Sequence, residues 1–186
     1  MDYYRLVMKE QEKDCIIVNN YDLKGFDLRK LWYSEKICEW NNDIILYYDR
    51  KGNVLDYMPN VLSWLILSDK MINVFRDLNI PNIQIMPVTL YKKGDINKTL
   101  KYNILNVLTI LSAMNWDKSN YSTWEDNPKE IKVIKKLVMN KSAIPKDIDI
   151  FNLSEAVPYY IISANLKRAF EKNNITGIDF VPIDTI

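Results

Sequence analysis

The apolar residues of this chain occur in short runs between polar turns, and most runs have the length of a β-strand. The runs at 3–8 and 15–18 predict an early sheet edge or a hairpin. The runs at 44–48 and 54–57 flank a five-residue polar loop with a glycine near its end, which predicts a further hairpin. The stretch 27–37 fits either a short helix or an irregular arm.

One stretch of the sequence occurs twice, at residues 64–88 and 159–183, and the two copies align without a gap. The number of identical pairs exceeds what ordinary residue usage predicts for two unrelated stretches of this length. The identical pairs are Ile66/Ile161, Ser68/Ser163, Phe75/Phe170, Asn79/Asn174, Ile80/Ile175, Ile83/Ile178 and Pro87/Pro182.

Each copy predicts a strand, a helix and a second strand. Aromatic and apolar residues form the first strand, and the serine that follows, Ser68 or Ser163, is suited to cap the N–H groups of a helix. Met71 and Phe75 mark the apolar face of the first helix, and an asparagine suits each helix end. The predicted fold class is α+β, with mixed sheets and two repeated strand, Ser-capped helix, strand units packed into one core. We expect a single domain over residues 1–186.

Three segments outside the repeat are also apolar enough to form regular structure. Residues 100–111 and 131–139 have a periodicity that fits a buried strand and a helix equally well. Residues 147–151 alternate between aspartate and apolar side chains, which favours a strand. The hydrophobic pattern alone leaves the first two segments open.

The composition is that of an ordinary soluble protein. Its 186 residues suffice for one domain with its own core, and 48% of them are apolar and 26% charged. No apolar run is long enough to span a bilayer, and the first residues lack the pattern of a signal peptide. We therefore expect a cytoplasmic protein with no membrane partner, in which Cys15 and Cys38 are buried, unbridged thiols.

Charge and residue usage disfavour several classes of function. The 25 basic and 24 acidic residues give a formal net charge of +1, so no overall field attracts nucleic acid. The chain contains no histidine, the commonest metal ligand and the side chain that titrates near neutral pH. Zinc sites and Ser-His-Asp triads are thereby disfavoured, and we expect no metal, no cofactor, no nucleic-acid partner and no catalytic residue.

Two short patterns resemble catalytic motifs but fit structural roles better. The segment 94–99 ends like a phosphate-binding loop but lacks the second glycine before its lysine. Ser68 is followed after one residue by a lysine that could activate it, whereas its counterpart Ser163 has no such neighbour. A surface loop and a pair of helix caps explain these residues.

Two other functions remain as alternatives. The first is a carboxylate- and magnesium-dependent enzyme that acts on a phosphorylated substrate, built on Asp147, Asp149 and Lys98. The second is a small-molecule or nucleic-acid sensor. Its candidate phosphate contacts are Lys132, Lys135 and Lys136, but with no arginine among them and no interleaved aromatic residue they fit a solvated face better.

The strongest candidate for recognition is the stretch 115–128, which is rich in aromatic and acidic residues. Tryptophan and tyrosine are enriched among the residues that dominate binding energy at protein interfaces, and acids suit a basic partner. The alternative is that the two tryptophans fold back as lids on the core. The candidate partner-binding residues are Trp116, Asp117, Tyr121, Trp124, Glu125 and Asp126.

Several short motifs together resemble one known family. They are Tyr3-Tyr4, Asp56 with Pro59, the unit from Ser68 to Pro87, Tyr102 with Leu105-Asn106-Val107, Phe151, and the unit from Ser163 to Pro182. On these residues the chain resembles immunity-protein family eleven of bacterial polymorphic toxin systems, formerly a domain of unknown function. The segment Asp117-Lys118-Ser119 is one residue shorter than the family pattern, and Asn152 stands where a basic residue is usual.

This resemblance implies an intracellular α+β protein without catalytic residues. It further implies that the chain binds and neutralises the toxin domain of an effector, either from a neighbouring cell or its own. The implied partner is thus a cognate protein toxin domain. The resemblance also favours strands for residues 100–111 and 131–139.

Overall fold

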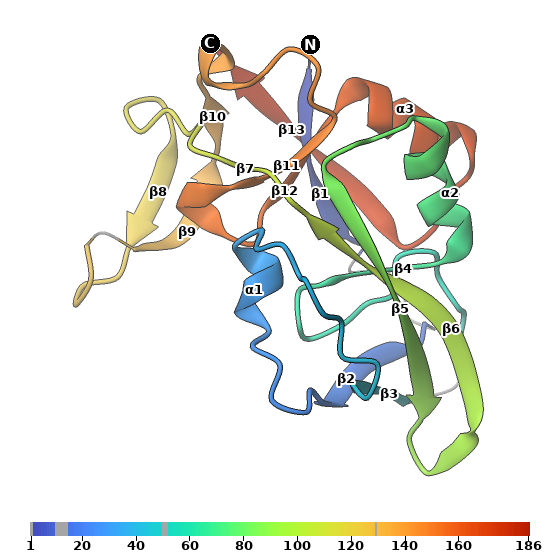
Figure 1. Cartoon of the computed structure of the whole chain (residues 1–186). Coiled ribbons are helices and arrows are strands. Elements are labelled where there is room, and N and C mark those ends of the chain that lie inside the picture. Colours follow the sequence, from blue (N-terminus) through green and yellow to red (C-terminus); the bar gives the residue numbers. More distant parts are fainter. Residues whose placement is uncertain (1, 10–14, 50–51, 129) are drawn as a thin grey trace.

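Two mixed β-sheets hold most of the chain in the computed structural model, which describes residues 2–9, 15–49, 52–128 and 130–186 (Figure 1). The six-stranded sheet contains, in spatial order, β10 (Val138–Met139), β13 (Ile178–Thr185), β1 (Tyr3–Met8), β12 (Tyr160–Ser163), β11 (Ile150–Leu153) and β7 (Ile110–Leu111). The five-stranded sheet contains β2 (Ile17–Asp22), β3 (Ile45–Asp49), β5 (Ile83–Lys92), β6 (Asp95–Val107) and β4 (Leu65–Leu67).

The remaining elements are three helices and a separate pair of strands. The helices are α1 (Arg29–Trp32), α2 (Asp69–Asp77) and α3 (Ala164–Lys172), and single 3₁₀ turns occur at Lys141–Ala143 and Ser154–Ala156. The separate pair is β8 (Asn120–Thr123) and β9 (Ile131–Lys136). Because both sheets combine parallel with antiparallel pairs and carry few helices, the α+β prediction is confirmed.

The segments 64–88 and 159–183 fold into the same order of elements. The Ser68 hydroxyl accepts a hydrogen bond from the Met71 N–H at 3.2 Å and caps α2, and Ser163 caps α3 through the Leu166 N–H at 3.1 Å. Beyond each helix an asparagine has a positive φ, 51° in one segment and 48° in the other. A left-handed residue at this place ends a helix, and asparagine tolerates that conformation.

In each segment a third, antiparallel strand lies between the two strands of the repeat. β6 pairs with both β4 and β5, and β1 pairs with both β12 and β13. The registers correspond. Ile104 on β6 faces Ile66 and Met86, and Arg5 on β1 faces Ile161 and Val181, which are the equivalent residues of the second segment. We call β4, α2, β5 and β6 unit 1, and β12, α3, β13 and β1 unit 2.

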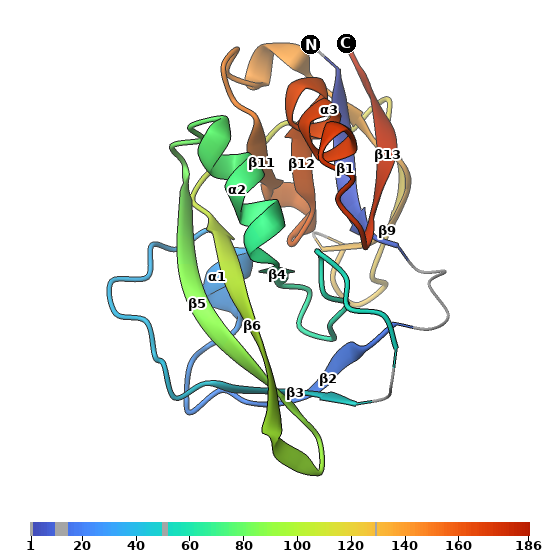
Figure 2. The same cartoon turned by 90° about the vertical axis from the view of Figure 1, so that its right-hand side faces the viewer.

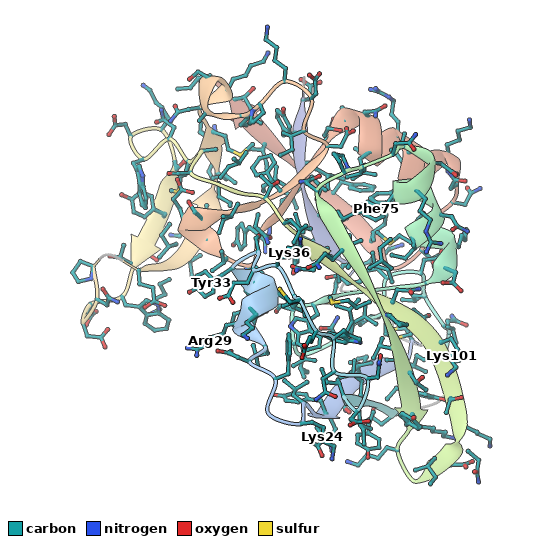
Figure 3. All side chains as sticks on the ribbon, viewed as in Figure 1. Lys24, Arg29, Tyr33, Lys36, Phe75 and Lys101 are labelled. Carbon is teal, nitrogen blue, oxygen red and sulfur yellow. The ribbon has the colours of Figure 1, made fainter. Side chains whose placement is uncertain are left out.

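Helices α2 and α3 pack against each other on the inner side of both units (Figure 2). Phe75 and Phe170, which occupy equivalent positions, meet edge to face with ring centroids 5.4 Å apart. Both rings belong to one buried cluster that also takes side chains from β4, β6, β11 and β12; Phe75 is labelled in Figure 3. A contact between equivalent residues is what a local twofold relation produces. That the two segments are copies of one repeat, and that residues 1–186 form a single domain, stay predictions.

Each unit also contacts the segment that precedes the other unit. Asn82 in unit 1 donates a hydrogen bond to the Ile150 carbonyl at 2.8 Å. In the reverse direction, Asp56 accepts hydrogen bonds from the N–H and the hydroxyl of Thr176, both at 2.9 Å. The next residue, Gly177, has a φ of 80°, and a Cβ there would lie 2.4 Å from the Tyr57 carbonyl oxygen. The close approach of the two units therefore requires glycine at this position.

Several expected elements differ from those observed. The hairpin over 44–57 is wrong, because β3 pairs with β2 and β5, whereas Tyr57 donates its N–H to the Thr176 carbonyl at 3.1 Å. Two residues of its expected loop, 50–51, lie outside the described residues. The early hairpin of 3–8 with 15–18 is also wrong, since β1 and β2 belong to different sheets.

The strand predicted at 147–151 begins three residues later, at Ile150, and runs to Leu153. All four residues of β11 are buried, so the observed strand lacks the alternation that suggested it. Residues 100–111 and 131–139 are strands, as the family resemblance favoured. Cys38 is exposed rather than buried. None of the helices in the described part of the chain is long and apolar enough to cross a membrane.

Candidate partner-binding surface

Strands β8 and β9 form an arm that projects from the six-stranded sheet (Figure 1, yellow and tan). We use the name arm for residues 115–128 and 130–136. Its ladder pairs Tyr121 with Ile134 and Ser122 with Val133, and register shifts on both sides twist it. Within the described chain neither strand has a second partner strand, so the arm presents two open edges.

The base of the arm is fixed to β10 by hydrogen bonds. The Ser119 hydroxyl accepts from the Val138 N–H at 3.0 Å, and the Asn115 N–H donates to the Val138 carbonyl at 2.8 Å. The Asn115 side chain also donates to Asn140 at 2.7 Å. These contacts orient the arm although few of its side chains are buried.

The aromatic residues of the arm pack on one another and stay accessible. Trp116 is 45% exposed and Trp124 is 43% exposed, so the alternative that they act as lids on the core is wrong. The ring of Tyr121 meets Trp116 edge to face at 5.2 Å, and the Lys132 ammonium lies 4.8 Å from the centre of Trp124. One aromatic pair and one cation–π contact therefore lie partly exposed at the surface of the arm.

The predicted acids lie at the surface of the same arm. Asp117, Glu125 and Asp126 are exposed. Glu130, in the connection to β9, accepts a hydrogen bond from Asn127 at 3.2 Å. The structure thus gathers the six predicted residues on one projection, but shows no partner; their role in binding stays a prediction.

The sequence interpretation assigned Lys132, Lys135 and Lys136 to a solvated face but did not join residues 131–136 to the candidate partner-binding stretch. Lys132, Val133, Lys135 and Lys136 are indeed exposed. Lys136 forms an ion pair with Asp184 of β13 at 2.8 Å. The density of lysines was the available signal, because lysine is almost never fully buried unless it is paired.

The residues of the alternative enzymatic site have separate structural roles. Asp149 accepts hydrogen bonds from the Ser163 hydroxyl and from Asn165, while Asp147 is exposed ahead of β11. Lys98 pairs with Asp95 at 3.3 Å near the tip of the β5–β6 hairpin, at the other end of the molecule (Figure 1). Over the described residues no group of three or more cysteines and acids is placed to hold a metal ion.

The segment 94–99 likewise has a structural role. Gly94, with a φ of 82°, makes the turn between β5 and β6, and the chain continues as a strand from Asp95. A phosphate-binding loop requires a helix at this place, because the helix N-terminus supplies the N–H groups that hold the phosphate. The comparison with such loops therefore fails on geometry.

Both capping serines donate a hydrogen bond to an aspartate. Ser68 donates to Asp56 at 2.7 Å, and Ser163 donates to Asp149. Partial burial alone would raise the pKa of Asp56, but hydrogen bonds from Ser68, Thr176 and Lys70 outweigh burial and hold the pKa below its usual value. Each serine hydroxyl therefore accepts from a helix N–H and donates to a carboxylate, so its hydrogen bonds serve the start of the helix.

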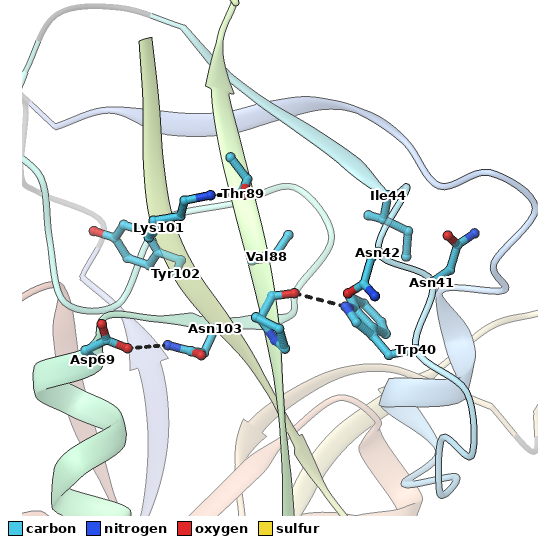
Figure 4. Close-up of a pocket in the computed structure, with 11 residues that line it drawn as sticks. Trp40, Asn41, Asn42, Ile44, Asp69, Val88, Thr89, Lys101, Tyr102 and Asn103 are labelled. Atoms are coloured by element: carbon cyan, nitrogen blue, oxygen red, sulfur yellow. Dashed lines mark hydrogen bonds between the residues drawn. The ribbon is translucent and has the colours of Figure 1, made fainter. Parts of the chain in front are cut away.

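A shallow polar groove of about 350 Å³ lies on unit 1 between β5, β6 and the segment around Trp40 (Figure 4). Several of its polar groups bond to one another: the Trp40 indole donates to the Pro87 carbonyl, and Lys101 donates to Thr89, each at 2.9 Å. Asn103 donates to Asp69 at 2.7 Å. Such mutual satisfaction makes this groove a poor candidate for binding.

Comparison with known proteins adds one finding. The model of an immunity protein family (Imm11) matches residues 4–185, which is nearly the whole chain. A comparison with curated proteins gave no match. The family match spans both units, the arm and α1.

Proposed function

Because the chain belongs to the immunity protein family (Imm11), we propose that it binds the toxin domain of a bacterial polymorphic toxin in the cytoplasm and neutralises it by protein–protein interaction. The family supports a toxin-neutralising role and a toxin partner in general terms. The identity of the toxin domain and the mode of binding are the parts that we propose.

The observation that carries the proposal is the arm. The arm carries Trp116 and Trp124, and both are about half exposed. This exposure is unusual, since tryptophan is highly buried on average. Its base is held to β10, so little order has to be gained on binding. Aromatic anchors of this kind supply most of the energy of many interfaces.

In the proposed mechanism the arm and the adjoining sheet cover the active site or substrate groove of the toxin domain. Trp116 and Trp124 fill pockets on the toxin, and Asp117, Glu125 and Asp126 meet basic side chains at the rim. Rim charges mainly raise the association rate, whereas the buried aromatic residues slow dissociation. No catalytic group is required for this mode of action.

The test is to coexpress the chain with a candidate toxin domain, sought first in the neighbouring gene, and to measure growth rescue and the affinity of the purified complex. Replacing both Trp116 and Trp124 by alanine should weaken the complex about 30-fold or more, because hot-spot side chains contribute most of the binding energy.

A matched control is Tyr33→Ala, which removes another exposed aromatic side chain, on the segment that follows α1. This control should leave affinity and rescue unchanged. Unchanged affinity in the double tryptophan variant would remove the arm from the interface. Absence of any complex with the wild-type chain would defeat the proposed function.

A further inference from the structure

The two open edges of the arm differ in how well they are protected against pairing with another strand. Natural sheet edges are blunted by lysine, proline and bulges, because an unprotected edge is a template for further strands. β9 contains Lys132, Lys135 and Lys136, and its register with β8 skips Lys132 and Lys135. β8 has the sequence Asn-Tyr-Ser-Thr, without lysine or proline, and each of its residues has a partner in the ladder. The edge of β8 is therefore unprotected.

β8 also lies on the outer side of the arm. Figure 1 shows β9 between β8 and β10. β9 adjoins the six-stranded sheet, since Ile134 and Lys135 line a cavity of about 170 Å³ together with Val181 of β13. A partner can thus reach the edge of β8 without displacing another described strand.

The polar side chains of β8 are unused within the described part of the chain. Asn120 and Ser122 are exposed, and Tyr121 packs its ring on Trp116. No described residue forms a hydrogen bond with any of the four side chains of β8. The groove near Trp40 differs in this respect, because several of its polar groups bond to one another. Donors and acceptors without an internal partner are available to a bound protein.

Other strand edges among the described residues are short, covered or protected. Of the strands that end the two large sheets, β4, β7 and β10 have only two or three residues each. The remaining one, β2, is partly covered, because the Val18 N–H donates to the Pro59 carbonyl at 2.8 Å. β6 and β13 extend beyond their short neighbours, and there they carry Lys98 and Lys101 or Pro182. β8 stands out from all of these strands.

A strand edge selects its occupant by the geometry of the backbone. The Trp124 N–H, just after β8, donates to the Glu130 carbonyl at 3.2 Å and so points toward the β9 side. N–H groups alternate in direction along a strand, so the N–H of the preceding Thr123 points to the open edge. Only an extended backbone presents donors and acceptors at the matching spacing. The occupant that fits this edge is therefore a β-strand.

We propose that an extended segment of the toxin domain pairs with the open edge of β8 and becomes the third strand of the arm. This inference rests on the proposed function and adds the mode of contact. Trp116 packs on Tyr121, so it lies on one face of the widened sheet and covers an apolar side chain of the added strand.

The toxin domain fits this edge better than a second copy of the chain. Two four-residue strands pair over far less than the roughly 1,200 Å² that a stable complex buries. The family match implies a toxin partner in general terms, and under the proposed function that partner also covers Trp116 and Trp124. Strand pairing then adds direction and register to an interface whose energy comes from the aromatic residues.

The first experiment compares hydrogen exchange of the full chain, alone and bound to the candidate toxin domain, by mass spectrometry. Exchange over residues 120–123 should slow about tenfold or more, because N–H groups that faced water become hydrogen-bonded. The distant turn at Lys93 and Gly94 should not change. A complex in which residues 120–123 exchange as fast as in the free chain overturns the proposal and leaves the proposed function intact.

The second experiment removes one N–H from the edge. Thr123→Pro deletes an N–H that points away from β9, which an edge strand tolerates, and the matched control Thr123→Val keeps the N–H but lacks the hydroxyl. Thr123→Pro should weaken the complex about tenfold or more, and Thr123→Val less than about threefold. Equal affinities of the two variants overturn the proposal. If exchange of the β9 amides shows that Thr123→Pro has lost the arm, the measurement on the wild-type chain decides.

Two further outcomes separate this inference from the proposed function. Absence of any complex with the wild-type chain defeats the proposed function, and this inference with it. Concentration-dependent dimerisation of the free chain in analytical ultracentrifugation, abolished by Thr123→Pro but not by Thr123→Val, assigns the edge to a second copy. That result overturns the proposal and leaves the role of the tryptophans in toxin binding to be judged by their own variants.

Discussion

Units 1 and 2 share their inner packing and differ at their outer faces. Inside, equivalent phenylalanines touch each other and equivalent serines cap the two helices. Outside, residues 23–44, which we call the α1 cover, seal unit 1, while unit 2 exposes Arg5 and Val181 beside the arm. The difference teaches that the backbone register sets where a face lies, and that a few side chains decide whether it becomes core or accessible surface.

The largest test exchanges the residues at the central position of the two outer faces. Ile104→Arg places a charge in a fully buried site without a partner and should lower the free energy of unfolding by at least about 4 kcal/mol. Arg5→Ile, the reverse exchange, should change it by about 1 kcal/mol or less, because this face is accessible. Urea unfolding monitored by circular dichroism measures both, and similar losses in the two variants would contradict the comparison.

A milder test truncates the neighbouring position in each unit. Met86→Ala leaves a cavity beneath the α1 cover and should cost about 2 to 4 kcal/mol in the free energy of unfolding. Val181→Ala removes a side chain that is largely in solvent and should cost about 0.5 kcal/mol or less. If Val181→Ala proves as costly as Met86→Ala, the face of unit 2 is covered in solution.

The smallest expected effect concerns the contact that the two units share at Asp56. Asp56→Asn should lower the free energy of unfolding at pH 7 by about 1 to 2 kcal/mol, because the carboxylate accepts several hydrogen bonds but is only partly shielded. The folded-state pKa of Asp56 is lowered, so its stabilising effect is fully present above the unfolded pKa of about 3.9.

This stabilising effect is lost as the pH falls through the lower folded-state pKa. The difference in unfolding free energy between wild type and Asp56→Asn should therefore be constant near neutrality and shrink below about pH 4. Parallel urea titrations from pH 7 to pH 3 measure it. A difference that grows toward acid pH would show that the carboxylate is not held in its charged form.

Local signals explain the parts of the fold that the sequence predicted. Ser68 and Ser163 fix helix starts through contacts three residues away, and apolar spacing marks the helix faces, so these elements need no distant information. The failed hairpin shows the limit of this reasoning. Residues 54–57 have the pattern of a strand. Their backbone nevertheless bonds to Thr176, far along the chain, through the Tyr57 N–H and the Thr176 carbonyl.

The surfaces were predictable to different degrees. The density of tryptophan and acid in 115–128 led to the prediction of a recognition segment, which stays a prediction, whereas the projection of this segment from the sheet was not foreseeable. The exposed face of unit 2 could not be found in this way. In the sequence Arg5 is a single charged residue in a short apolar strand. Only the fold places β12 and β13 on either side of it and Lys135 of the arm nearby.

The position of β1 between β12 and β13 also sets the order in which the two units can pair their strands during translation. Unit 1 is made from one continuous stretch of chain, so it can pair its strands as soon as β6 has left the ribosome. Unit 2 has to keep its central strand, β1, unpaired until β12 and β13 emerge much later along the chain, since domains form as their segments become available. The surface around Arg5 is therefore assembled last, together with the pairing of β13 to β10 that supports the base of the arm.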